Sequence, residues 1–338
     1  MRDQRIDSMR FIGLAMIILA HVDPPPILFQ LRNFDVPLMV LVAGVSFNAS
    51  YDPSTHYWRY LWRRVRRLVF PAWIFLSCYL SLFLCLGPGP HALTIKTVVT
   101  SYTFLSGIGY VWIVRVFLLV AIVAPLVYGL SRRTRSNYRY VLILAIVLVL
   151  YDLARHLSLP LITNDAGETV SLLTHYLVPY SVVFAIGVRM RLLTRRQVLG
   201  MAGICLGLFA CFALGLYLVH GSIRSPQSFK YPPSLYYLSY GLFAASILHL
   251  CSGAITRCIA LVKGAGFVSF VARNSMWVYL WHIPMAKHLQ MSWAPKYAVT
   301  FALATGITYC QVWIVENLVV NHLPSERGKR AIRSVFTG

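Results

Sequence analysis

The chain has 338 residues, of which 58% are hydrophobic and only 12% are charged, about half the charged share of an average soluble domain. A net charge of +21 would suggest nucleic-acid binding in a soluble protein, but the mean hydropathy of +0.66 and the long apolar runs require a lipid solvent. The composition also excludes a disordered chain, a disulfide-rich scaffold and a coiled coil. We therefore predict a single all-α membrane domain over residues 1–338 that binds no nucleic acid.

The apolar stretches predict a polytopic bundle of about ten transmembrane helices. A crossing helix needs about 20 mostly apolar residues, and Pro, Gly, Asn and Ser mark the joints between the stretches. The first two stretches are short for a full crossing, as expected where a helix tilts little or the bilayer is thinned. In chain order the predicted spans are 8–22, 36–50, 68–86, 108–130, 138–156, 172–190, 197–220, 234–256, 267–290 and 295–320.

The distribution of Lys and Arg predicts the orientation of these spans. The N-terminus, the even-numbered loops and the C-terminus hold most of the 31 basic residues, so both termini are expected in the cytoplasm, with 321–338 as a short cytoplasmic tail. Most of these side chains are expected to meet anionic lipid headgroups. A signal peptide over the first 22 residues is a weaker interpretation, because no small-x-small cleavage site follows. The seven cysteines form no C-x-x-C pair, so we predict no metal site.

The first predicted span carries a titratable residue at each end, Arg10 and His21. Eleven helical residues turn through three full turns and about 20°, so both side chains are predicted on one face, about 16 Å apart along the axis. Charged groups inside spans are costly and mark function by default. The alternative is that Arg10 reaches the lipid surface as an end residue and His21 is an interfacial helix-end histidine.

Two later spans also carry polar groups that lipid would disfavour. Arg115 follows Trp112 in the fourth span, where an arginine is expected to face the bundle interior, with a structural ion pair as the alternative. In the ninth span Ser275, Tyr279 and His282 fall at i, i+4 and i+7, which predicts a polar stripe on one helix face. Such a stripe lines a cavity or bonds a neighbouring helix. For His282 a packing role is the alternative.

A cluster of arginines precedes the third predicted span. Arg63, Arg66 and Arg67 share a helical face by their i, i+3, i+4 spacing. Forked guanidinium groups suit phosphate oxygens, so this face is a candidate phosphate site on the cytoplasmic side. The alternative is that the cluster only sets topology.

Taken in order, five segments of the chain resemble the motifs of the acyltransferase 3 family of integral-membrane O-acyltransferases. Two positions depart from the family pattern, because Asp35 stands where many members carry histidine and Ala43 where many carry serine. The resemblance covers residues 5 to about 284. The segments are the Arg10–His21 pair, Phe34 to Gly44, Arg63 to Pro71, Trp112 to Arg115 and Ser275 to His282.

This resemblance implies transfer of an acyl group, usually acetyl from acetyl-CoA, to a carbohydrate hydroxyl. It implies a multi-pass protein of the bacterial cytoplasmic (inner) membrane, whose partners are acyl-CoA, membrane lipids and a glycan acceptor, either an exported surface polysaccharide or a lipid-linked glycan. The oligomeric state stays open, a homo-oligomer included. Acetyl-CoA is the expected donor, and no metal is expected.

The resemblance also suggests a role for each candidate residue. His21 would act as general base or accept the acyl group, Arg10 would guide the donor, and Asp35 would orient His21. The arginine face would hold the CoA phosphates. The groups expected to contact substrate, some of them near the oxyanion, are Trp112, Arg115, Ser275, Tyr279 and His282.

Two other classes compete with the acyltransferase. A transporter or flippase for a glycan or small anion would also need buried charges and a positively charged entrance. Transporters commonly show internal repeats and paired interrupted helices, however, and neither is visible in this sequence. A non-catalytic subunit of a polysaccharide assembly machine would leave the Arg10–His21 alignment without a purpose.

Overall fold

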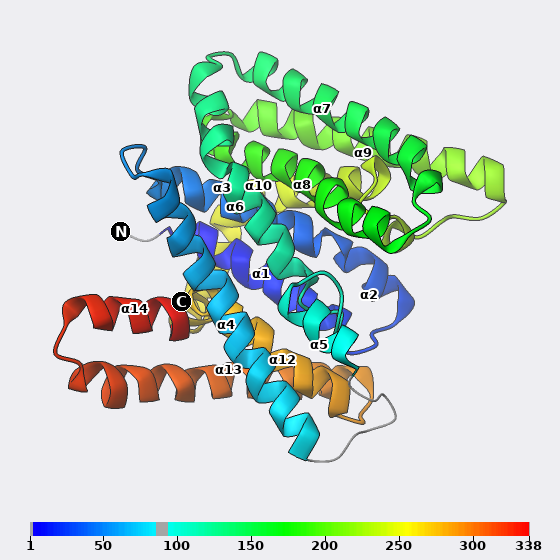
Figure 1. Cartoon of the computed structure of the whole chain (residues 1–338). Helices are drawn as coiled ribbons and strands as arrows, with labels where there is room; N and C mark the ends of the chain where they lie inside the picture. The colour runs from blue at the N-terminus through cyan, green and yellow to red at the C-terminus, as the bar shows by residue number, and fades with distance from the viewer. Residues whose placement is uncertain (1–2, 86–93, 338) are drawn as a thin grey trace. The chain divides into compact units, whose positions relative to one another are not determined.

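A computed structural model describes residues 3–85 and 94–337, and within these ranges the chain is all-helical, with no strand (Figure 1). The long helices are α1 (Gln4–Ala20), α3 (Asp35–Ser50), α4 (Tyr57–Cys85), α6 (Trp112–Arg133), α7 (Asn137–Ser158), α8 (Asp165–Arg189), α9 (Arg195–His220), α10 (Leu235–Leu261), α12 (Ser275–His288) and α13 (Trp293–Ile314).

Shorter helices connect or extend these elements. They are α2 (Pro26–Leu31), α5 (Ile95–Tyr102), α11 (Ala265–Arg273) and α14 (Glu326–Phe336), the 3-10 turns η1 (Arg32–Phe34), η2 (Leu159–Leu161), η3 (Met190–Leu192), η4 (Pro226–Phe229) and η6 (Val320–His322), and the π-helical turn η5 (Val315–Val319).

In the described residues, eight helices are long and apolar enough to cross a membrane, which confirms the all-helical membrane class but not the count of ten. The first and the ninth predicted spans are not among these eight helices. Helix α1 has only 17 residues. The ninth is divided at Asn274 into α11 and α12, where the Asn274 side chain donates to the Phe270 carbonyl four residues earlier. A side chain that bonds its own backbone in this way competes with the regular helical ladder.

The third span and the C-terminal tail also differ from the prediction. Helix α4 begins at Tyr57, so the arginine cluster lies inside the helix and not before it. The predicted tail, residues 321–338, contains the amphipathic helix α14, whose Arg333 side chain forms an ion pair with Glu316 of η5 (2.8 Å). Residue 86, at the end of the predicted third span, lies outside the described residues.

The chain divides into two compact units. One contains residues 3–17, 26–54 and 119–265, and the other contains 18–25, 55–85, 94–118 and 266–337. In the first unit α3 packs on α8 with almost no space between their backbones. A Cβ atom built on Gly44 would lie 2.2 Å from the Phe184 carbonyl oxygen, and one on Gly187 would lie 2.1 Å from that of Leu41. Small residues permit this close approach, as is typical of membrane helices.

In the second unit, α12 packs on both α13 and α4, and α14 packs on α4 and η5. Aromatic rings fill these contacts. Trp281 of α12 lies edge-on to Phe75 of α4, and Trp277 stacks on Phe336 at the end of α14. The Trp277 indole also donates to the Val335 carbonyl (2.8 Å). The C-terminal helix is therefore anchored to the helix that carries Tyr279 and His282.

Candidate functional site

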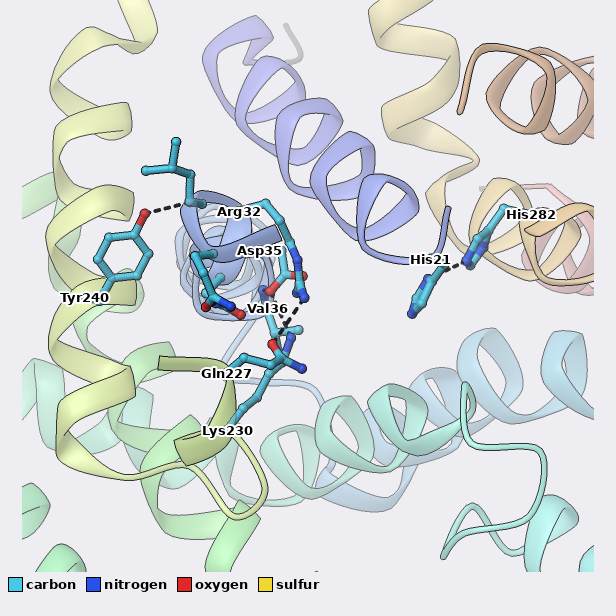
Figure 2. Close-up of polar contacts among 11 residues, drawn as sticks. His21, Arg32, Asp35, Val36, Gln227, Lys230, Tyr240 and His282 are labelled. Carbon is cyan, nitrogen blue, oxygen red and sulfur yellow. Dashed lines mark hydrogen bonds and ion pairs between the residues drawn. The ribbon is translucent and has the colours of Figure 1, made fainter. Parts of the chain in front are cut away.

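Two histidines from distant parts of the sequence meet in the second unit (Figure 2). His21 directly follows the last residue of α1, and His282 lies on α12. Their rings are nearly parallel, with His21 Nδ1 2.9 Å from His282 Nε2. His282 is completely buried, whereas His21 is half-buried. The structure thus joins a residue of the first predicted motif to one of the last.

The contacts of this pair define which ring nitrogens carry protons. His282 Nδ1 lies against the backbone carbonyl of Tyr279, and a carbonyl oxygen can only accept a hydrogen bond. In the neutral ring His282 Nδ1 is therefore the donor and Nε2 the acceptor. His282 Nε2 then accepts from His21 Nδ1–H. By this assignment the ring lone pair of neutral His21 is on Nε2, the nitrogen through which an imidazole acts as a base.

Tyrosines surround the pair. The Tyr110 ring lies edge-on to His21, with centroids 4.7 Å apart, and edge-on to His282 at 6.3 Å. The Tyr279 hydroxyl donates to the Tyr110 carbonyl, which fixes the segment before α6 against α12. Ser275, Tyr279 and His282 lie on one continuous helix, as their spacing predicts, and Ser275 is its first residue. His282 contacts His21 directly through its ring, and the Tyr279 carbonyl acts one step away, through His282 Nδ1.

Arg10 lies in the first unit, on α1. Its guanidinium donates to the Ser46 hydroxyl of α3 (2.8 Å), and Ser46 in turn donates to the Val42 carbonyl. The predicted alignment of Arg10 with His21 concerns residues assigned to different units, and it stays a prediction.

Asp35 occupies a buried ion network in the first unit (Figure 2). One carboxylate oxygen accepts from Arg32 (2.9 Å) and the other from Lys230 (3.2 Å), and the Val36 amide donates at 2.7 Å. Arg32 also donates to Gln227 of η4 (3.1 Å). These contacts link the start of α3 to the segment between α9 and α10. A role for Asp35 in orienting His21 stays a prediction.

This network holds two cations and one anion away from water. The side chains of Arg32, Asp35 and Lys230 are each at most 4% exposed. Burial lowers the pKa of the Lys230 amino group, and the Asp35 carboxylate opposes that effect. The Phe29 ring lies 4.1 Å from the Arg32 guanidinium carbon and offers it a negative π face. Arg32 and Lys230 could not be predicted from the sequence as partners of Asp35, because nothing in their local sequence pairs them with it.

The three clustered arginines lie on α4, so they share a helix face as predicted. Arg63 and Arg67 are exposed, and Arg66 is half-buried. The Arg66 Nε atom is buried and donates no hydrogen bond in the described part of the chain. A guanidinium N–H without an acceptor, beside two exposed guanidinium groups, suits a ligand with several oxygen atoms.

Arg115 and Trp112 lie in the first turns of α6. Arg115 is buried and donates to the backbone carbonyls of Phe104 and Leu105. Phe104 has a positive φ of 60°, so the arginine stabilises a strained turn after α5. Trp112 is half-buried. The predicted substrate contacts of both side chains stay predictions.

The comparisons with known proteins assign the chain to a family. A family model described as an acyltransferase domain matches residues 3–316, nearly the whole chain. No curated protein and no solved structure matches the sequence. The chain therefore belongs to the acyltransferase 3 family, as its motifs predict, and is a helical membrane protein of acyltransferase type.

Proposed function

We propose that this member of the acyltransferase 3 family transfers an acetyl group from acetyl-CoA to a hydroxyl of an exported or lipid-linked carbohydrate, in the bacterial inner membrane. The observation that carries the proposal is the hydrogen-bonded chain from the Tyr279 carbonyl through His282 to His21. It gives His21 one tautomer and one ring orientation. A base held in this way is what acyl transfer to a hydroxyl needs.

In the proposed reaction His21 Nε2 takes the proton of the acceptor hydroxyl while that oxygen bonds to the thioester carbonyl carbon. The tetrahedral intermediate collapses, the carbon–sulfur bond breaks, and His21 returns the proton to the CoA sulfur. Between these steps His21 is an imidazolium, and its Nδ1–H bond to neutral His282 becomes charge-assisted and therefore stronger. His282 is thus a positioning residue that also stabilises the charged form of His21.

The donor is proposed to bind with its phosphates against Arg63, Arg66 and Arg67. The buried Arg66 Nε atom supports this placement, because a phosphate oxygen would supply the acceptor that the described residues do not. Arg10 is proposed to guide the thioester end. Trp112, Arg115 and Ser275 are proposed to line the acceptor side, where donors near the thioester oxygen would stabilise its negative charge.

The proposal is tested by measuring CoA released from acetyl-CoA by the purified protein in detergent, with water alone and with glucose as a hydroxyl probe. We expect CoA release by the wild-type protein, and His21→Ala should reduce the rate by about 10²–10⁴-fold. A matched control is His220→Ala, because His220 is exposed at the end of α9 in the other unit. Its rate should equal that of the wild type. Normal turnover by His21→Ala, or no CoA release by the wild type, would contradict the proposal.

A further inference from the structure

The first unit carries an apolar groove that the proposed reaction does not use. It has a volume of about 620 Å³, within the range of ligand-binding cavities, and lies between α7 and α9 over α8 and α10. Both α7 and α9 contribute side chains to its lining, and the Asn137 side chain at the start of α7 donates to Gln197 at the start of α9 (2.9 Å). The groove therefore begins where these two helices begin.

The two ends of the groove differ in chemistry. Four of its polar residues, Asn137, Thr194, Arg196 and Gln197, gather at the starts of α7 and α9, and Arg196 is the only charged one among the described residues that line it. From there the lining is almost entirely apolar, with Leu142, Ala145, Leu148 and Val149 from α7 and Gly200, Ile204 and Leu208 from α9. A positive, polar end followed by a hydrocarbon channel matches an amphiphile with an anionic head.

Several hydrogen bonds tie the polar end of the groove together. Thr194 and Gln197 form a capping box at the start of α9, and Asn137 also donates to the Leu192 carbonyl (3.0 Å). Buried Arg189 donates to the Asn137 side chain (2.8 Å) and so holds it in place. Arg196 itself is exposed and not committed to this network. The positive dipole ends of α7 and α9 also lie here, and they favour a negative charge at the same place.

The length of the groove matches one leaflet of a bilayer. Arg196, Gly200, Ile204 and Leu208 follow each other at intervals of one turn along α9. Twelve helical residues rise about 18 Å, a little more than half of the roughly 30 Å hydrocarbon core. Only 17% of the α7 window and 11% of the α9 window are buried, so both helices present most of their surface outward, where lipid is expected.

We infer that this groove binds one anionic phospholipid, with its phosphate at Arg196 and one acyl chain along the apolar lining between α7 and α9. The site is separate from the residues proposed to act in acyl transfer. Because the same groove could be covered by a second copy of the chain, the test must separate lipid from protein as the occupant.

The test uses nanodiscs of phosphatidylcholine that contain a trace of photoreactive lipid, either phosphatidylglycerol or phosphatidylcholine with a diazirine in the acyl chain. Crosslinked peptides are mapped by mass spectrometry. We expect crosslinks within residues 141–149 and 200–208, and about fivefold more with the anionic lipid, the effect of one Arg near an anionic headgroup. Crosslinks that lie elsewhere, or equal labelling by both lipids, would overturn the inference.

Two pairs of variants sharpen the result. Arg196→Gln should remove the preference for phosphatidylglycerol, whereas Arg195→Gln, a neighbour that does not line the groove, should keep it. Gly200→Leu should fill the groove and reduce crosslinking by both lipids at least tenfold. A side chain at Gly200 or at Gly207 meets open space, so Gly207→Leu, outside the lining, is the control for the extra bulk.

The variants also identify a protein occupant. If Gly200→Leu crosslinks lipid as strongly as the wild type, the inference is wrong. If the wild-type protein is a dimer in detergent and Gly200→Leu makes it a monomer, a second copy covers the groove and the lipid assignment is overturned.

Discussion

His21 and His282 are separated by 261 positions in the sequence, yet His21 Nδ1 lies 2.9 Å from His282 Nε2. The orienting partner of the candidate base is thus a neutral imidazole, whose own orientation is set by a backbone carbonyl one turn earlier on α12. A neutral acceptor fixes the tautomer of His21 without placing a negative charge beside the ring.

The first prediction separates positioning by His282 from simple packing. His282→Ala removes the acceptor for the Nδ1–H of His21, so kcat for CoA release from acetyl-CoA should fall about tenfold to a hundredfold, with KM little changed. His282→Gln offers a side-chain oxygen at a similar reach and should restore much of the loss. If both variants lose activity equally and also lose thermal stability, His282 acts only as a buried packing residue.

The second prediction concerns the ion network of the first unit. Asp35→Asn removes the carboxylate that pairs with both Arg32 and Lys230, and leaves the two buried cations without it. Breaking a buried ion pair from one side typically costs about 3–5 kcal/mol, so the melting temperature in detergent should fall markedly. The double variant Asp35→Asn/Lys230→Met should recover part of that loss, because it removes one of the two cations.

Asp35→Asn also tests the predicted role of Asp35 toward His21. If the Asp35 carboxylate serves only as a structural ion-pair partner, Asp35→Asn should lower the melting temperature. Activity should then be lost only as the protein unfolds. An unchanged melting temperature with a large fall in kcat would instead support the orienting role that the sequence suggested.

The third prediction addresses the contact of α3 with α8. The added methyl of Gly44→Ala would lie 2.2 Å from the Phe184 carbonyl oxygen, so the two helices must separate. We expect a loss of about 1–3 kcal/mol of stability, measured by thermal unfolding in detergent. Gly203→Ala on α9 is the matched control, because its new methyl meets no atom within 4 Å. Its stability should equal or slightly exceed the wild type, since Ala favours helix over Gly. Equal stability of the two variants would contradict the close packing.

Much of the fold could be predicted from the sequence, because membrane helices are set by local hydrophobicity. The predicted spans 138–156 and 197–220 correspond to α7 and α9 within a few residues. The short first span and the divided ninth are harder, since they depend on side chains that bond the backbone and on neighbours that cover a short helix. Asn274 gives no more signal in the sequence than any other asparagine within an apolar stretch.

The candidate site could be predicted only in part, for a similar reason. Spacing along one helix places Tyr279 and His282 on one face, and intramembrane charge marks Arg115 as buried. A contact between two residues that are far apart in the sequence leaves no such local signal. Nothing near Lys230 points to Asp35, which lies 195 positions earlier, and only the folded chain brings them within 3.2 Å.

The last prediction tests the donor site on α4. Arg66→Ala should raise KM for acetyl-CoA about tenfold to a hundredfold, the usual value of a hydrogen bond to a charged group, while kcat changes little, because the phosphates lie far from the thioester. Arg63→Ala should act in the same direction but less strongly, because that side chain is exposed and solvated. The effect should weaken as salt is added.

A control is needed because every Arg→Ala change lowers a net charge of +21. Arg139→Ala removes one exposed arginine from α7, a helix of the other unit that contributes no residue to the proposed donor site, and should leave KM for acetyl-CoA unchanged. If Arg139→Ala raises KM as much as Arg66→Ala does, the arginines of α4 act through the general positive field of the protein and hold no phosphate. If Arg66→Ala lowers kcat with KM unchanged, the arginine acts at the reacting centre and the proposed placement of the donor is wrong.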